Sequence, residues 1–182
     1  MARWGVVTGF VVGLLLVVTG CSGDLGGDPA EPSQLADPCA LVTDDLLAKL
    51  SAGSPRAPSE ILGEISGSKS CEVNLEDGTS GMRGDLVVSV AVDGTDTYDD
   101  GWRNNRCGRI QADPSEDGPG DLSCLMVQPW DGGQSRVDGY AWMGDDFEAR
   151  VAYQLVDPQE LPAGTEDDMR ALLAAAVESL PA

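Results

Sequence analysis

Cysteine is the residue type in this sequence with the clearest chemistry, and histidine is absent altogether. The lack of histidine excludes Ser-His-Asp and Cys-His nucleophile pairs, zinc hydrolase motifs and imidazole proton shuttles. The five cysteines divide into Cys21, which follows an apolar leader, and four that are spread through the rest of the chain. We therefore expect cysteine chemistry to concern attachment and cross-linking, and we expect no catalytic residue and no cofactor.

Cys21 follows a segment with the layout of a secretory signal peptide. Residues 1–20 carry the basic Arg3, no acidic residue and an apolar run, residues 6–18, that is shorter than the ~20 residues of a membrane span. Val18-Thr19-Gly20-Cys21 places an aliphatic residue three before the cysteine and small residues directly ahead of it, which resembles the bacterial lipobox. The resemblance implies cleavage before Cys21, a diacylglycerol thioether and palmitate-type acylation there, and a lipid anchor on the extracytoplasmic face of the cell membrane.

The remaining cysteines are predicted to form structural disulfides. They are Cys39, Cys71, Cys107 and Cys124. An even number in an exported chain, without a C-x-x-C motif, predicts two disulfides. Three pairings are possible, and the order along the chain favours Cys39 with Cys71 and Cys107 with Cys124. A zinc site needs clustered ligands and a redox centre needs closely spaced thiols, so neither is expected.

The acidic insert, residues 93–121, is the strongest candidate for a binding site. Its carboxylates could bind calcium or act as an acid/base pair, but the EF-hand pattern fails and no metal is expected. The candidate binding residues are Asp96, Tyr98, Asp99, Asp100 and Trp102. Such a surface suits a cationic protein or small ligand, with the aromatic side chains supplying the desolvated contact. The alternative is a solvated loop whose Trp102 packs inward from a short helix.

The charge of the chain limits its partners. It carries 11 Lys+Arg against 31 Asp+Glu, a net charge of −20, and removal of residues 1–20 would take away Arg3 and no acid. Such a surface is repelled by phosphate backbones and by anionic lipid headgroups, which excludes nucleic-acid binding. The acyl chains on Cys21 should therefore be the domain's sole attachment to the membrane.

The mature chain is predicted to contain one domain behind a tether. Residues 21–36 hold the lipidated cysteine and a Pro/Gly-rich flexible tether, and residues 37–182 form a single α+β domain. A helix should begin near Thr43, and Thr165 should cap a C-terminal helix with one apolar stripe. Alternating apolar residues predict strands near residues 71–75, 86–92, 122–128, 136–143 and 147–155.

These elements predict an antiparallel sheet of about five strands with N-terminal and C-terminal helices packed on it. Gly144-Asp145-Asp146 is a hairpin signal between the last two strands. Tyr140 and Trp142 share one strand face, where packing against a helix is expected over a ligand platform. Gly63, Gly67 and Ser70 predict a loop around Ser66 and Lys69, whose S-x-x-K spacing therefore lacks the context of a catalytic motif.

The lipobox, the short tether, Asp37-Pro38-Cys39 before a short helix, and Gly118-Pro119-Gly120-Asp121 before a strand resemble an uncharacterised family of actinobacterial lipoproteins. Such lipoproteins are similar to the sandwich of the photosystem oxygen-evolving subunit and nuclear-transport cofactor class. The resemblance implies a third, shorter helix within residues 95–106. It implies no catalytic residue.

Three functions are compatible with these residues. The first is a lipid-anchored, non-enzymatic domain that binds a protein partner or small ligand. The second is a carboxylate-dependent hydrolase of envelope glycans. The third is a structural surface protein.

Overall fold

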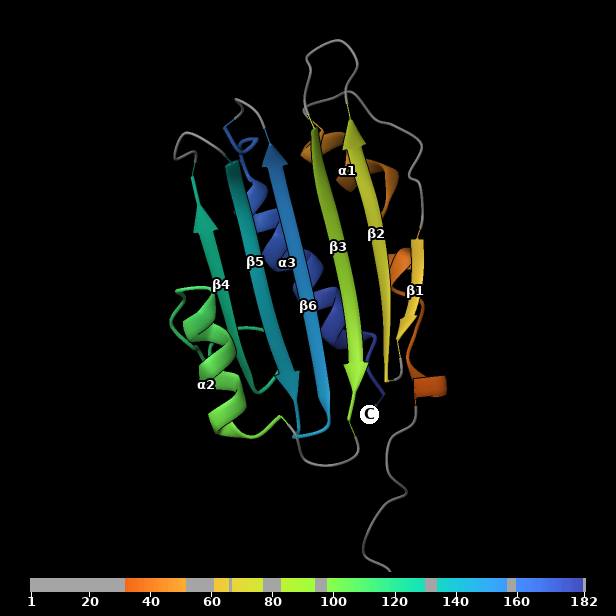
Figure 1. Ribbon diagram of the computed structural model, residues 1–182, viewed down its shortest axis with the longest axis vertical. Helices are drawn as coiled ribbons and strands as arrows, with labels where there is room; N and C mark the ends of the chain where they lie inside the picture. The colour runs from red at the N-terminus through yellow and green to blue at the C-terminus, as the bar shows by residue number, and fades with distance from the viewer. Residues whose placement is uncertain are drawn as a thin grey trace, which may run out of the picture.

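The computed structural model describes residues 32–51, 61–65, 67–76, 83–93, 98–129, 134–156 and 160–181. It contains one antiparallel sheet of six strands in the order β1-β2-β3-β6-β5-β4 (Figure 1). The strands are β1 (Ile61–Ile65), β2 (Ser68–Glu76), β3 (Arg83–Val92), β4 (Leu122–Gln128), β5 (Gln134–Met143) and β6 (Phe147–Val156). The α+β class and the antiparallel sheet are thus as predicted.

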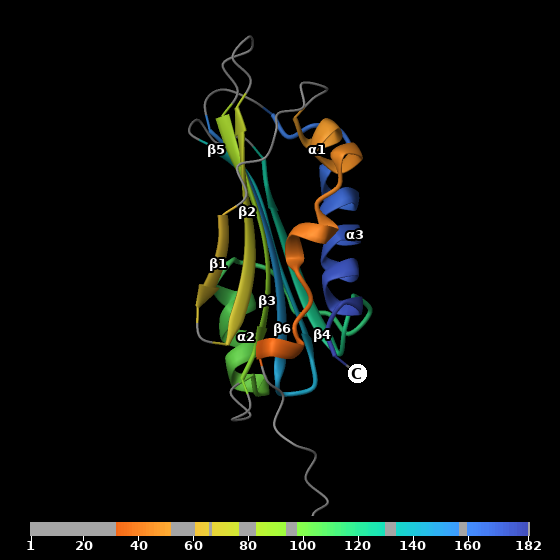
Figure 2. The same cartoon turned by 90° about the vertical axis from the view of Figure 1, so that its right-hand side faces the viewer.

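One face of the sheet carries the main hydrophobic core. Helix α3 (Thr165–Glu178), helix α1 (Asp44–Leu50) and the 3-10 helix η2 (Pro38–Leu41) lie on this side (Figure 2). Alternate residues of β3 and β6, such as Val88 and Val151, are fully buried against Met169 and Leu173 of α3. The Tyr153 hydroxyl donates to the Leu50 carbonyl at 2.6 Å, which fastens the end of α1 to the sheet.

The opposite face, here called the open face, is covered by one short helix. Helix α2 (Asp100–Arg109) lies over the lower part of β4 and β5, on the side of the sheet away from α3 (Figures 1 and 2). Tyr140 and Trp142 of β5 are buried beneath it with Cys107 and Cys124. The prediction that these two aromatics pack against a helix is confirmed, and α2 overlaps the range expected for a third helix.

The strands differ from expectation at one place. Residues 61–65 form β1, and Gly67, with φ 85°, makes the turn into β2. The prediction of a loop there is wrong, because the glycine-rich stretch forms a hairpin whose first strand has too little side-chain alternation to be recognised. The hairpin predicted at Gly144 is confirmed, with Gly144 at φ 57° between β5 and β6.

The N-terminal boundary of the domain also differs. The 3-10 helix η1 (Pro32–Gln34) precedes Leu35, which is 3% exposed and belongs to the main core. The Leu35 carbonyl accepts a hydrogen bond from the Lys69 ammonium at 2.5 Å. Residues 32–36 therefore belong to the domain and not to the tether. The signal peptide and Cys21 lie outside the described residues.

Helix α3 is capped differently from the prediction. Gly164, in the left-handed conformation at φ 85°, is the N-cap, and Thr165 is already helical with its hydroxyl donating to the Pro162 carbonyl at 2.7 Å. The left-handed turn suits glycine, which has no Cβ to clash there. Helix α1 does begin as predicted, with the Thr43 hydroxyl accepting from the Leu46 amide.

Two disulfides are present, in the predicted pairing. Cys39–Cys71 joins η2 to β2, and Cys107–Cys124 joins α2 to β4. Each therefore ties a peripheral helix to the sheet, one on each face.

Candidate functional site

The residues predicted as a site mostly serve to attach α2. The Asp99 carboxylate is the N-cap of this helix and accepts from the Trp102 amide at 2.8 Å. Tyr98 is 8% exposed and belongs to the aromatic core under α2. Burial, with the Glu148 and Asp93 carboxylates nearby, raises the pKa of Tyr98 to about 12. Tyr98 is therefore buried, whereas the Asp99 carboxylate caps the helix and is still exposed.

Trp102 and Asp100 are, together with Asp99, the exposed members of the predicted set. Trp102 is 37% exposed, and its ring is tilted against Tyr98 at a centroid distance of 6.1 Å. The Asp100 carboxylate faces solvent, 3.9 Å from the Arg103 guanidinium. Asp96 lies outside the described residues. A cation-binding surface stays a prediction, and Asp99, Asp100 and Trp102 are the described residues of the set that are exposed for it.

A buried carboxylate organises the contact between α2 and the sheet. Glu148 is 8% exposed, and one of its oxygens accepts from the indole nitrogens of Trp102 at 3.3 Å and Trp142 at 3.0 Å. The Arg106 guanidinium lies 3.9 Å from the same oxygen and stacks over Trp102 at 4.9 Å. Because a buried carboxylate is costly unless it is hydrogen-bonded and paired, this arrangement fixes both indole rings.

Arg103 attaches the start of α2 to the β5–β6 hairpin. It is 7% exposed and donates to the Tyr98 carbonyl, the Gly144 carbonyl and the Asp145 carboxylate, each at 2.6 Å. A planar guanidinium can satisfy several acceptors at once in this way. The start of α2 is therefore held by polar contacts.

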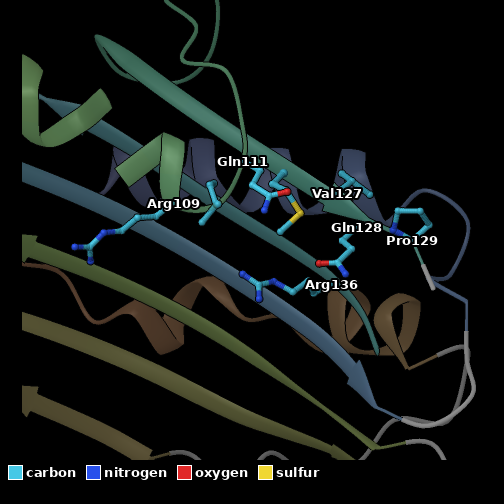
Figure 3. A pocket seen from close by; sticks show the side chains of 8 residues that line it. Arg109, Gln111, Val127, Gln128, Pro129 and Arg136 are labelled. Atoms are coloured by element: carbon cyan, nitrogen blue, oxygen red, sulfur yellow. The ribbon is translucent and has the colours of Figure 1, made fainter. Parts of the chain in front are cut away.

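A groove opens where α2 ends. It has a volume of about 460 Å³ and is here called the arginine groove; its lining residues are Arg109, Ile110, Gln111, Met126, Val127, Gln128, Pro129 and Arg136. Figure 3 shows Arg109 and Gln111 coming from the end of α2, Val127, Gln128 and Pro129 from the end of β4, and Arg136 from β5. The groove thus combines two guanidinium groups, two amides and an apolar wall.

The backbone is strained at the edge of this groove. Gln111 has φ 58°, the left-handed region that non-glycine residues rarely occupy. Its amide donates to the Gly108 carbonyl at 3.1 Å, and the Ala112 amide donates to the Cys107 carbonyl at 3.0 Å, which is the Schellman ending of α2. Glycine is the usual residue here, so the glutamine side chain is retained in the groove at a conformational cost.

A second hollow of about 290 Å³ continues from the groove across the open face and shares Arg136 with it. Asp138 lies between two arginines, with Arg136 at 2.5 Å and Arg150 at 3.7 Å. The Arg150 guanidinium also lies 5.6 Å from the centre of the Tyr140 ring. The middle of the open face is therefore a charged surface in a mostly apolar sheet.

Five of the described arginines lie on the open-face side of the sheet, whereas Arg170 lies on α3. Arg103, Arg106 and Arg109 lie on α2, and Arg136 and Arg150 project from the open face. Among the residues that the structure describes, no carboxylate pairs with Arg109.

The arginine groove is not evident from the sequence, in which acidic residues far outnumber basic ones. Arg103 and Arg106 lie one turn apart in the range where a short helix is expected, but Arg109 lies beyond that range. The register of β5 with β6 places Tyr140 opposite Arg150 and so puts Arg136 and Arg150 on one face of the sheet. That Arg109 and Arg136 line one groove depends on the tertiary fold.

Within the described ranges, no three histidine, cysteine, aspartate or glutamate side chains converge to hold a metal ion. No helix in the same ranges is long and apolar enough to cross a membrane. Comparison with family models, with curated proteins and with solved structures finds no match to this chain.

Proposed function

We propose that this protein is a lipid-anchored extracytoplasmic binding domain without catalytic activity, and that its binding site is the arginine groove. The observation that carries the proposal is the position of Arg109 and Arg136 around one groove in a chain of net charge −20. Arginines in such a chain would ordinarily pair with its abundant carboxylates, yet Arg109 has no ion-pair partner in the described part of the molecule.

The groove has the chemistry to hold an anionic group. Guanidinium groups recognise carboxylate and phosphate oxygens through paired hydrogen bonds, and the Gln111 and Gln128 amides can donate further ones. Ile110, Met126 and Val127 supply apolar contact beside the charge. In a ligand site, placed polar groups of this kind fix the orientation of the ligand.

The groove is tested by a charge-removing variant. Arg109→Gln should reduce retention of the ligands captured from an envelope extract about tenfold, because a charge-assisted hydrogen bond is lost. Arg170→Gln is the matched control, since Arg170 lies on α3 and pairs with Glu166 at 3.1 Å. Equal retention by both variants would remove the groove from the proposal.

The anchor is tested separately. Cys21→Ala should move the protein from the detergent phase to the aqueous phase, because the acidic domain has no other attraction to a membrane. Ser22→Ala keeps the cysteine and should stay in the detergent phase. Partition of Cys21→Ala with the detergent would show that another element holds the protein to the membrane.

A further inference from the structure

Strand β4 forms one edge of the sheet, and only its first half is covered in the described structure. The Ser123 amide donates to the Ser115 carbonyl at 2.9 Å, and the Ser115 amide donates to the Ser123 carbonyl at 2.8 Å. This isolated bridge occupies the outer edge near the start of β4. Among the described strands, none lies outside β4 (Figure 1).

The second half of the strand presents unpaired backbone groups. In the pairing of β4 with β5, Leu125 is opposite Gly139 and Val127 is opposite Val137. Leu125 and Val127 follow Ser123 along β4 by two and four residues. Because hydrogen bonds alternate in an antiparallel ladder, the amides and carbonyls of Leu125 and Val127 point outward, as those of Ser123 do. Neither residue has a hydrogen bond on that outer side from the described residues.

This free edge coincides with the arginine groove. Met126, Val127 and Gln128 of the edge strand line the groove together with Arg109 from the end of α2 and Arg136 of β5, which is opposite Gln128 in the sheet. Exposed strand edges are normally blocked by lysine, proline or a covering loop. Strand β4 contains neither lysine nor proline, because Pro129 comes directly after its last residue, and Val127 is 36% exposed. Main-chain donors and acceptors of the edge thus border the groove that is lined by the unpaired Arg109 and by Arg136, which pairs with Asp138.

We propose that an extended, acidic segment of a partner protein adds to the sheet as a strand along Leu125–Val127, with an acidic side chain against Arg109 and Arg136. This inference rests on the proposed function and names the partner of the same groove. Backbone bonds to an edge give affinity in this mode of recognition, and alternate side chains give specificity. Every second side chain of the added strand would face the arginine side of the sheet.

Charge and geometry disfavour two other occupants. A second copy of the chain would bring another net charge of −20, and pairing of two β4 edges would place the arginines of both copies near one another. The chain's own acidic tether enters the domain at Pro32, on the side of β1, which is the opposite edge of the sheet (Figure 1).

The probe is a set of short synthetic peptides of alternating threonine and valine with one central aspartate, asparagine or lysine. They are titrated against the detergent-solubilised, lipidated protein. The aspartate peptide should bind at least about tenfold more tightly than the lysine peptide, because a charge-assisted hydrogen bond replaces a like-charge contact. Its binding should slow hydrogen exchange at the Leu125 and Val127 amides. Unchanged exchange at both amides would overturn strand addition.

Two variants separate the backbone contact from the charge. Val127→Pro removes an outward amide without removing a bond to β5, and Val127→Thr keeps the amide and the branched shape. We expect the proline variant to lose binding of the aspartate peptide at least about tenfold, with an unchanged unfolding temperature, and the threonine variant to retain it. Arg109→Gln should remove the preference for aspartate, whereas Arg109→Lys should retain most of it.

The outcomes distinguish this inference from the function on which it rests. If Arg109→Gln weakens capture from the envelope extract while Val127→Pro does not, the groove binds its ligand without strand addition and the inference falls alone. If neither variant changes capture, both fall. A concentration-dependent dimer in ultracentrifugation that Val127→Pro abolishes would identify a second copy as the occupant and also overturn the inference.

Discussion

The two faces of the sheet are covered in different ways. Helix α3 buries Met169, Leu172, Leu173, Ala176 and Val177 against β3, β5 and β6, whereas α2 buries only Arg103 and Cys107 of its own residues. A fully buried aliphatic side chain contributes roughly 1.5–3 kcal/mol, so α3 is held by the hydrophobic effect. Helix α2 is held by a disulfide, a guanidinium and a buried carboxylate.

The α3 face of the sheet mainly stabilises the fold, whereas the open face carries the polar side chains available for binding. The α3 face carries the main apolar core, where the Tyr153 hydroxyl already donates to the Leu50 carbonyl. The open face combines arginines, indoles and carboxylates, and α2 leaves part of it accessible beside the arginine groove. A small helix fastened at a few points can position polar side chains without sealing the surface that carries them.

The largest expected loss of unfolding free energy comes from removing either of the two disulfides, one of which lies on each face of the sheet. Cys39→Ala with Cys71→Ala should cost about 4 kcal/mol of unfolding free energy, and Cys107→Ala with Cys124→Ala about 3, from the chain entropy of the two loops. The second pair should in addition release α2, seen as fast hydrogen exchange of its amides while α3 stays protected. Retained protection of α2 would contradict the view that a cross-link holds it.

Removal of the buried carboxylate should have the next largest effect. Glu148→Ala leaves the indole nitrogens of Trp102 and Trp142 without their acceptor, and Trp142 is fully buried. We expect a loss of about 2 kcal/mol in denaturant unfolding. Glu148→Gln keeps an acceptor oxygen and should lose less; equal losses would show that charge, through Arg106, matters more than the hydrogen bonds.

Alkaline pH should weaken the α2 face through Tyr98. Its folded pKa of about 12 lies above the ordinary tyrosine value of 10.0, so the unfolded chain loses this proton first. Stability is therefore complete below pH 10 and falls as the pH rises toward 12, by on the order of 1 to 2 kcal/mol. Tyr98→Phe should remove this part of the slope in denaturant unfolding, while the part from Tyr153, whose pKa is also raised by burial, should persist.

The smallest expected effect is a gain in the free energy of unfolding. Gln111→Gly should raise the unfolding free energy by about 1 kcal/mol, because glycine accepts the left-handed conformation without the steric cost. The same change removes an amide from the arginine groove and should weaken ligand retention. Gln111→Asn tolerates the conformation better than glutamine and keeps an amide, so it should gain stability with a smaller loss of binding. A more stable glycine variant with unchanged retention would mean that Gln111 does not contact the ligand.

The sequence predicted the elements with strong local patterns. Strands β2 to β6 were recognisable because a half-buried strand alternates apolar and polar residues, and α1 because Thr43 precedes two aspartates. Strand β1 was missed because Gly63 and Gly67 indicate a turn, and only the pairing with β2 makes residues 61–65 a strand. The cap of α3 was placed one residue late, because both Gly164 and Thr165 suit that position.

The candidate site was less accessible to sequence reasoning. Local capping chemistry explains Asp99, and the aromatic core explains Tyr98, so two of the predicted site residues have structural roles. The arginine groove escaped because its residues come from three segments, the end of α2, the end of β4 and the start of β5.

The sequence by itself determined the alternation that assigns each strand residue to a face, the cysteines available for cross-linking, the acidic charge and the segment before Cys21 that resembles a lipobox. The tertiary structure alone decided that β3 lies beside β6, that β4 ends the sheet with a free edge, and that Arg109 and Arg136 share a groove. The physical reason is that periodicity and capping act between residues a few positions apart. Strand order and the meeting of distant side chains depend instead on burying the whole apolar surface at once.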